Sequence, residues 1–141
     1  MDSLKLVALD TDDLAVVSAH LQDGIIKTGD MVYLPKEQKF VFAVRRFDWE
    51  ISENEHPRRR LSGVHFDRVS SVRTKGINRT APDEVLNLLA MTFSCKAEPS
   101  GIVTLLFSGD REIELELECI EMQMKDLGPV WEVESRPEHS D

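Results

Sequence analysis

Long hydrophobic runs are missing from this 141-residue sequence. The longest uncharged apolar stretch, residues 101–109, is much shorter than the roughly 20 residues of a membrane-spanning helix. The first residues form no basic n-region and reach acidic side chains within ten positions, unlike a secretory signal. We therefore expect a cytoplasmic protein that has no membrane partner.

Cysteine is also scarce. Cys95 and Cys119 are the only two, and they lie far apart in apolar surroundings. This usage excludes a disulfide framework and is typical of small core residues in a reducing compartment. We expect both thiols to be buried and reduced.

Motifs of familiar catalytic or metal chemistry are missing as well. The four histidines form no HExxH or HxH pair, and no cysteine lies at metal-ligand spacing. There is no glycine-rich phosphate loop and no GxSxG turn. We predict neither a metal nor a cofactor, and these absences argue only against the familiar classes of enzyme.

What the sequence does contain is typical of one globular domain. Hydrophobic residues make up 41% and charged residues 30% of a chain that is long enough to bury a core. We predict a single domain over residues 1–134 and a flexible polar tail over residues 135–141.

Charge is distributed unevenly along the chain, whose formal net charge is −9. Residues 36–79 hold 11 of the 17 basic residues and six of the 26 acidic ones, which gives this segment +5 and the remainder −14. Such a segment either binds an anionic partner or neutralises acidic neighbours within the fold.

Hydrophobic periodicity predicts both helices and strands. Residues 4–9 are typical of a short strand, and residues 10–24 of a capped helix. Period-two patterns then predict about six strands, with one hairpin turning at residues 35–39 and another at residues 108–110. Helical spacing returns in residues 119–128.

This order of elements predicts the fold class α+β. We expect a mainly antiparallel, curled sheet of six to seven strands, or a partial barrel, packed by two short helices. A pleckstrin-homology-like barrel, closed at one end by the C-terminal helix, is one form that fits.

Four glutamates alternate with apolar residues in the strand predicted over residues 111–118. The pattern places Ile113, Leu115 and Leu117 inward and the glutamates on the solvent face. A neighbouring strand rich in Lys and Arg would relieve the repulsion, and residues 58–75 are the obvious donor.

Residues that could bind a partner gather in the basic region. Trp49 lies close to arginines, which resembles a stacking platform for bases and equally a strand that buries its aromatic residues. Three adjacent arginines follow Pro57 in the most loop-like stretch of the chain. The candidate binding residues are Arg45, Trp49, Arg58, Arg59, Arg60, Arg68 and Arg73.

His65 and Asp67 are weak candidates for catalysis. Two residues apart on a predicted strand, they project from the same face, and a carboxylate can orient an imidazole as a base. The alternative is an exposed polar face opposite buried Val64 and Phe66.

Several segments resemble a known family. Residues 13–50, 63–69, 86–90 and 117–131 are similar to a family of small alphaproteobacterial proteins grouped as domain of unknown function 2948. The resemblance implies a stand-alone, cytoplasmic bacterial protein. It carries over no activity, cofactor or catalytic residue.

Three functional hypotheses follow. The leading one is a non-enzymatic cytosolic interaction or regulatory domain that binds a protein or an anionic ligand through the basic central region. The second is an RNA- or DNA-binding module that uses the loop predicted at Arg58–Arg60, which the overall acidity disfavours. The third is an enzyme of unfamiliar class that uses His65 and Asp67.

Overall fold

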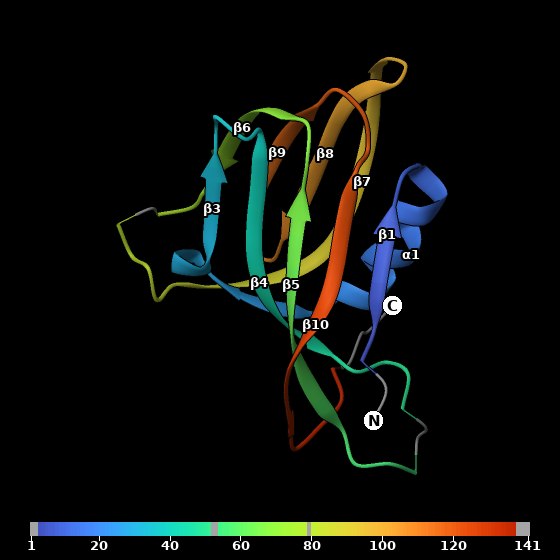
Figure 1. The fold of residues 1–141 in the computed structure, drawn as a ribbon. Coiled ribbons are helices and arrows are strands. Elements are labelled where there is room, and N and C mark those ends of the chain that lie inside the picture. Colours follow the sequence, from blue (N-terminus) through green and yellow to red (C-terminus); the bar gives the residue numbers. More distant parts are fainter. Residues whose placement is uncertain (1–2, 52–53, 79, 138–141) are drawn as a thin grey trace.

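The computed structural model describes residues 3–51, 54–78 and 80–137. Ten strands, one α-helix and one short 3-10 helix make up this part of the chain (Figure 1). The elements are β1 (Lys5–Ala8), α1 (Thr11–Leu21), β2 (Gly24–Lys27), η1 (Thr28–Asp30), β3 (Met31–Leu34), β4 (Lys39–Phe47), β5 (Arg58–Phe66), β6 (Val69–Lys75), β7 (Val85–Ala97), β8 (Ser100–Phe107), β9 (Arg111–Leu117) and β10 (Met122–Glu132).

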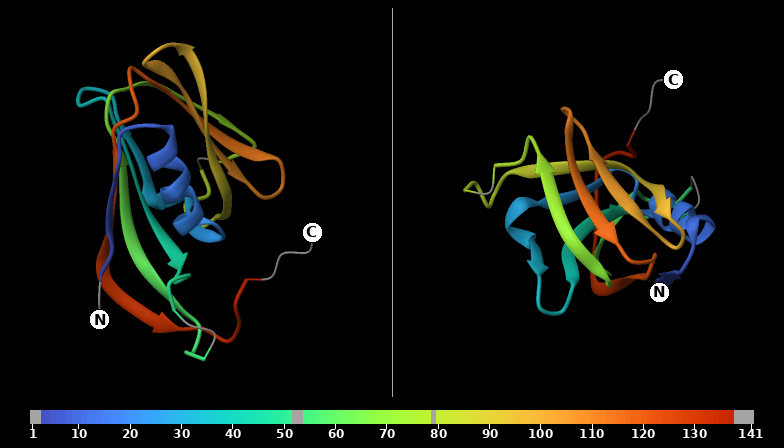
Figure 2. Two further views of the ribbon diagram at one scale, coloured as in Figure 1. Left: turned by 90° about the vertical axis from the view of Figure 1, so that its right-hand side faces the viewer. Right: turned by 90° about the horizontal axis from the view of Figure 1, so that it is seen from above.

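All ten strands belong to one antiparallel sheet. Its order is β1-β10-β5-β4-β2-β7-β8-β9-β6, and β3 pairs with β4 beside this path. The sheet is strongly curled, so that β4, β5 and β10 form one layer and β7, β8 and β9 form the other (Figure 2). The hydrophobic core lies between the two layers.

The single α-helix lies on the concave side of the sheet and packs against β7, β1 and β4 (Figure 2). The side chain of Asp10 caps it by accepting a 2.8 Å hydrogen bond from the backbone N–H of Asp13. Leu14, Val17 and Leu21 are buried, as expected for the apolar stripe of a helix. The predicted helix is confirmed.

Both predicted hairpins are confirmed. β3 and β4 pair around the turn at residues 35–38, and β8 and β9 pair around residues 108–110. Gly109 and Asp110 adopt φ values of 77° and 57° in the second turn, a region that glycine enters without strain. Leu115 in β9 is fully buried, so the inward and outward faces are as predicted.

The C-terminal segment is a strand and not the predicted helix. β10 pairs with β5 on one edge and with β1 on the other. Met122, Met124 and Asp126 are buried at alternate positions, whereas Leu127 is 51% exposed. Gly128, with φ of 115°, lies in an irregularity between two stretches of the β10–β5 ladder instead of ending a helix. Pairing partners distant in sequence decide the conformation here, and helical spacing alone was misleading.

The predicted fold class is therefore wrong in its elements. In the described part of the chain, the sheet has ten strands instead of six to seven, there is one α-helix instead of two, and a strand replaces the helix that would close a pleckstrin-homology-like barrel. η1 separates β2 from β3, and Arg68, with φ of 60°, separates β5 from β6. The mainly antiparallel, curled character of the sheet is as predicted.

The expectation of two buried cysteines is wrong. Cys95 is exposed and Cys119 is half-buried. A bulge in β7 buries Leu88 and Met91 but leaves Leu89 40% exposed, so the buried face changes along the strand. Beyond that bulge, the hairpin of β7 and β8 projects past the core (Figure 1), and the last four residues of β7, which include Cys95, are exposed.

The domain boundary predicted at residue 134 stays a prediction. Residues 138–141 of the predicted tail lie outside the described residues.

The curled sheet remains open along a seam between β3 and β6. In the described part of the chain, β3 pairs only with β4, and β6 only with β9. At one end the backbone N–H of Val69 donates to the carbonyl of Gln38 at 2.8 Å. Next to it, the Tyr33 hydroxyl donates to the carbonyl of Val69 at 2.9 Å. Because a tyrosine side chain spans the gap, the two edges are farther apart there than the ~4.8 Å of paired strands.

Candidate functional site

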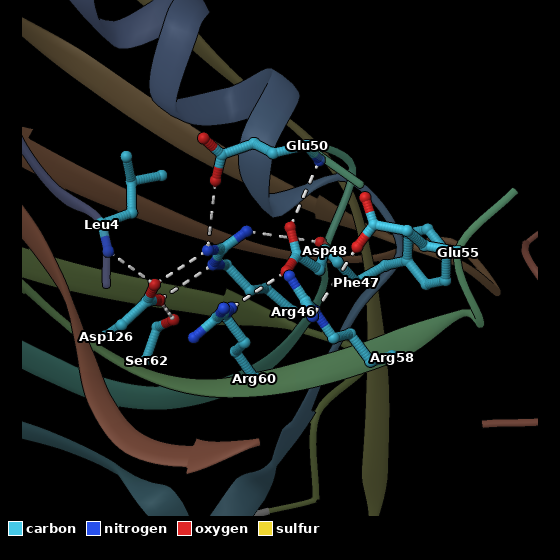
Figure 3. A network of polar contacts seen from close by, with 10 residues as sticks. All are labelled: Leu4, Arg46, Phe47, Asp48, Glu50, Glu55, Arg58, Arg60, Ser62 and Asp126. Atoms are coloured by element: carbon cyan, nitrogen blue, oxygen red, sulfur yellow. Dashed lines mark hydrogen bonds and ion pairs between the residues drawn. The ribbon is translucent and has the colours of Figure 1, made fainter. Parts of the chain in front are cut away.

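A cluster of buried charges joins β4, β5 and β10 (Figure 3). Arg46 is fully buried, and its Nε and Nη2 donate to the two carboxylate oxygens of Asp126 at 2.9 and 2.8 Å. The Ser62 hydroxyl donates to Oδ1 of Asp126 at 2.6 Å, and the backbone N–H of Leu4 donates to Oδ2 at 2.8 Å. The carboxylate of Asp126 thus connects Leu4, near the start of the chain, with β4 and β5 in the sheet.

Asp48 forms the second part of this cluster. It is 1% exposed, and its Oδ2 accepts from Nε of Arg58 at 2.8 Å and from Nε of Arg60 at 2.9 Å. Alternate positions on β5 put the two arginines on one face of the strand. The predicted Arg58–Arg60 loop is therefore the start of a strand, and two of its three guanidinium groups bind a carboxylate of the same chain.

Electrostatics keep these groups ionised. Burial alone would raise the pKa of Asp126, but hydrogen bonds from Arg46, Ser62 and Leu4 outweigh it and lower the pKa to about 2. Burial opposes the ionised form of Asp48 as well, and the arginines nevertheless hold its pKa below the usual value. For Arg46, the charge and hydrogen bonds of Asp126 outweigh burial and raise the pKa. The cluster is a compensated network of fixed charges.

Three further predicted binding residues lie near this cluster. Arg59 is half-buried and its Nη1 donates to the carbonyls of Asp23 and Arg45, while burial lowers its pKa. Arg45 lies 3.8 Å from a carboxylate oxygen of Asp30. The indole N–H of Trp49 donates to a backbone carbonyl. The prediction that these residues bind a partner is not tested by their positions.

Arg68 and Arg73 lie elsewhere. Both are exposed, and they face Glu121 at 3.7 Å and Glu114 at 3.6 Å. β6 runs beside β9, so the predicted neutralisation of the glutamate strand by residues 58–75 is confirmed for β6. It is wrong for β5, where Arg58 and Arg60 face Asp48 and Arg59 donates to backbone carbonyls.

His65 and Asp67 are neighbours, as predicted. Nδ1 of His65 lies 3.2 Å from a carboxylate oxygen of Asp67, and Nζ of Lys39 lies 3.6 Å from the other. Val64 and Phe66 on either side of His65 are buried, so the pair lies on the outer face of β5. The arrangement can orient an imidazole, and a catalytic role stays a prediction.

A cavity of about 480 Å³ occupies the seam between β3 and β6. This volume falls within the range of small-molecule sites. Phe40 and Ile113 contribute from the core, and Val72 contributes from the edge strand β6. Among the residues that the structure describes, none that lines the cavity is charged; they are Thr28, Gly29, Met31, Val32, Tyr33, Phe40, Val72, Thr74, Ile77 and Ile113.

Sequence reasoning missed this cavity. Phe40, Val72 and Ile113 occupy ordinary inward positions of alternating strands, and nothing in the local pattern separates them from core residues. The missing information is topological, because only the strand order leaves β3 and β6 without a partner between them.

The structure thus defines a curled, antiparallel sheet protein with an uncharged cavity at its open seam. A family model described as "Protein of unknown function (DUF2948)" matches residues 4–139, and the chain belongs to this family. No curated protein and no solved structure matches the chain significantly.

No group of three or more His, Cys, Asp or Glu side chains in the described ranges is placed to hold a metal ion. Within the same ranges, no helix is long and apolar enough to span a membrane.

Proposed function

We propose that this protein is a non-enzymatic binding domain whose ligand occupies the seam cavity between β3 and β6. The observation that carries the proposal is an uncharged hollow of about 480 Å³ between two strand edges that have no strand partner there among the described residues. Concave, mainly apolar sites with few polar groups are typical of small-molecule binding.

The absence of charge in the lining selects the class of ligand. A charged molecule would lose its hydration on entering and would find no counter-ion among the lining side chains that the structure describes. A neutral molecule with an apolar body gains free energy from burial against Met31, Phe40 and Ile113. The expected ligand is small, neutral and mainly apolar.

Anion binding by the basic central region has less support. Arg58 and Arg60 donate to Asp48, so their charges are balanced inside the fold. Two other hollows, of about 310 and 400 Å³, include Arg59 and Arg58 in their linings, but Asp23 and Glu55 line them too. A nucleic acid needs a broad positive surface, and these carboxylates work against one.

We place this binding activity in the bacterial cytoplasm. The support is cysteine chemistry, since Cys95 and Cys119 are both free thiols and Cys95 is exposed. Exposed free thiols persist in a reducing compartment.

A neutral fluorescent probe tests the proposal. N-phenyl-α-naphthylamine should bind saturably, with increased emission, to the wild-type protein. Val72→Trp fills the cavity from β6 and should weaken binding about tenfold or more, which corresponds to roughly 1.4 kcal/mol. The matched control is Val7→Trp, because Val7 is 51% exposed on β1, at the opposite end of the strand order from β6.

The control variant should bind as the wild type does. Circular dichroism and a thermal melt establish that both variants are folded. No saturable binding by the wild type, or equal binding by folded Val72→Trp, would refute the seam cavity as the binding site.

A further inference from the structure

The outer face of the layer that contains β4, β5, β10 and β1 is not covered by any element in the described part of the chain. The other face of this layer packs on α1 and the core (Figure 2). The side chains that point outward include apolar ones, namely Val41 and Ala43 on β4, Leu61 on β5 and Leu127 on β10. The open face of an antiparallel sheet is usually polar, and exposed apolar patches mark interaction surfaces. We call this surface the outer sheet face.

The centre of the outer sheet face is apolar. β5 is the middle strand, with β4 and β3 on one side and β10 and β1 on the other. Gly63 faces outward on β5 between buried Ser62 and Val64. A Cβ atom at Gly63 would lie 3.4 Å from Cδ1 of Leu127, so this leucine covers the middle strand while it remains 51% exposed. Leu61 is the next outward position along β5. An apolar centre within a polar rim is typical of protein interfaces.

Charged side chains of opposite sign lie on the two sides of this centre. Lys5 on β1 and Lys125 on β10 are paired in register, and both are exposed. Neither lysine has an ion pair among the described residues, and like charges directly opposite each other destabilise a sheet. On the other side of β5, Asp30 directly precedes β3. Its side chain is 41% exposed and lies 3.8 Å from Nη1 of Arg45 on β4.

We infer that the outer sheet face binds a second copy of this chain, with a two-fold axis that runs along β5. A two-fold interface pairs one patch with the same patch of the other copy, and an axis along β5 exchanges the two sides of that patch. Lys5 of each copy then faces Asp30 of the other, and the two Leu127 side chains meet near the axis. Sheets packed face to face often keep their strand directions within about 30°, which such an axis allows.

The charges decide between the possible axes. A two-fold axis across the strands would place Lys5 and Lys125 of both copies together, and like charges across an interface are costly. The axis along β5 avoids this repulsion and gives the exposed lysine of β1 a carboxylate partner. The inference concerns self-association and does not rest on the proposed function of the seam cavity.

Analytical ultracentrifugation over a range of protein concentrations measures self-association. The wild-type protein should reach twice the chain mass of 16.0 kDa in a reversible equilibrium. Leu127→Asp places a carboxylate at the centre of the interface and should raise the Kd of the dimer about tenfold or more. The matched control is Leu89→Asp, at a leucine that is 40% exposed on β7 in the other layer, and it should leave the Kd unchanged.

Charge reversal tests the orientation of the two copies. Lys5→Asp and Asp30→Lys should each raise the Kd about tenfold, because each places like charges together twice in a symmetric dimer. Combined in one chain, they should return the Kd to within about threefold of the wild-type value, since the pair forms again with its charges exchanged. Lys5 and Asp30 lie on opposite sides of β5 in one copy, so such a rescue requires contact between copies. Lys75→Asp, at an exposed lysine of β6, is the control and should have no effect.

Three results would overturn the inference. The first is a wild-type protein that stays monomeric at every concentration, which would leave the outer sheet face to a different partner. The second is a dimer that Leu127→Asp does not weaken, because it must use another surface. The third is a failure of the combined charge reversal to restore the dimer, which excludes the axis along β5. Circular dichroism establishes that each variant is folded, and Leu127→Ser replaces Leu127→Asp if the carboxylate disturbs the fold.

Discussion

The charge cluster and the seam cavity differ in the charged side chains that they contain. At the cluster, Arg46, Asp48 and Asp126 are buried, and each charge has a partner of opposite sign. At the seam, none of the described lining side chains is charged, yet a volume of about 480 Å³ is left unfilled. The most conspicuous residues of this chain pair with one another inside the sheet, whereas inconspicuous uncharged residues surround the cavity that we propose as a ligand site.

The strongest test of a structural role for the cluster is Arg46→Met. The change leaves the buried carboxylate of Asp126 without its bidentate partner, and breaking such a pair costs about 3–5 kcal/mol. Urea unfolding followed by circular dichroism measures the loss.

Arg45→Met is the matched control for Arg46→Met. It removes the neighbouring arginine, which is half-buried and 3.8 Å from Asp30, and it should cost less than about 1 kcal/mol. Similar losses of stability in the two variants would show that the buried Arg46–Asp126 pair contributes no more than the more exposed Arg45–Asp30 pair.

Arg60→Ser should have the next largest effect. Were the arginines at positions 58–60 only solvated counter-charges, their replacement by serine would barely change stability. Arg60 is 6% exposed and donates to buried Asp48, so we expect a loss of about 1.5–3 kcal/mol in the free energy of unfolding. Arg68→Ser, at an exposed arginine, is the control and should change it little.

Acid should weaken the cluster at a predictable pH. The pKa of Asp126 is lowered to about 2 in the folded state, below its ordinary value of 3.8. A depressed pKa contributes stability that is present above the unfolded value and is lost as the pH falls from about 4 to about 2, here about 2 kcal/mol. Urea midpoints across this range should fall more steeply for the wild type than for Asp126→Asn. Parallel pH profiles would show that this carboxylate is not ionised in the fold.

The smallest effect is expected on the outer face of β6 and β9. Arg73 is 3.6 Å from Glu114, and its side chain is 67% exposed. Arg73→Ser should cost between about 0 and 1 kcal/mol, and this cost should shrink further at high salt. Thermal melts at low and high salt measure it. A loss of stability as large as that of Arg60→Ser would show that exposed Arg73 on β6 stabilises the fold as much as buried Arg60 on β5 does.

Much of the fold could be predicted from the alternation of apolar and polar residues along the chain. The pairing of strands that are distant in sequence could not. The inward positions of Leu115 and the turn at residues 108–110 follow from local pattern alone. The strand β10 does not, because Met124 and Leu127 fit a helix until pairing with β5 and β1 is known. Pairing across more than a hundred residues has no local signature.

The same limit applies to the candidate site. His65 beside Asp67 was predictable from a two-residue spacing on a strand. The partner of Arg46 was not predictable, since Asp126 lies 80 residues away. The seam cavity could not be predicted from the sequence either. In the sequence, Val72 resembles any inward-facing valine, and only the strand order places it at an unpaired edge of the sheet.

The place of β10 in the sheet also sets the order in which the chain can fold. β10 comes last among the described elements, yet it lies between β1, the first strand, and β5. Until it is available, β1 has no neighbour in the sheet and the guanidinium of Arg46 has not met Asp126. Contacts of such long range make folding slow. During synthesis β1 must therefore wait for β10, so the sheet reaches its native form only after β10 has been translated.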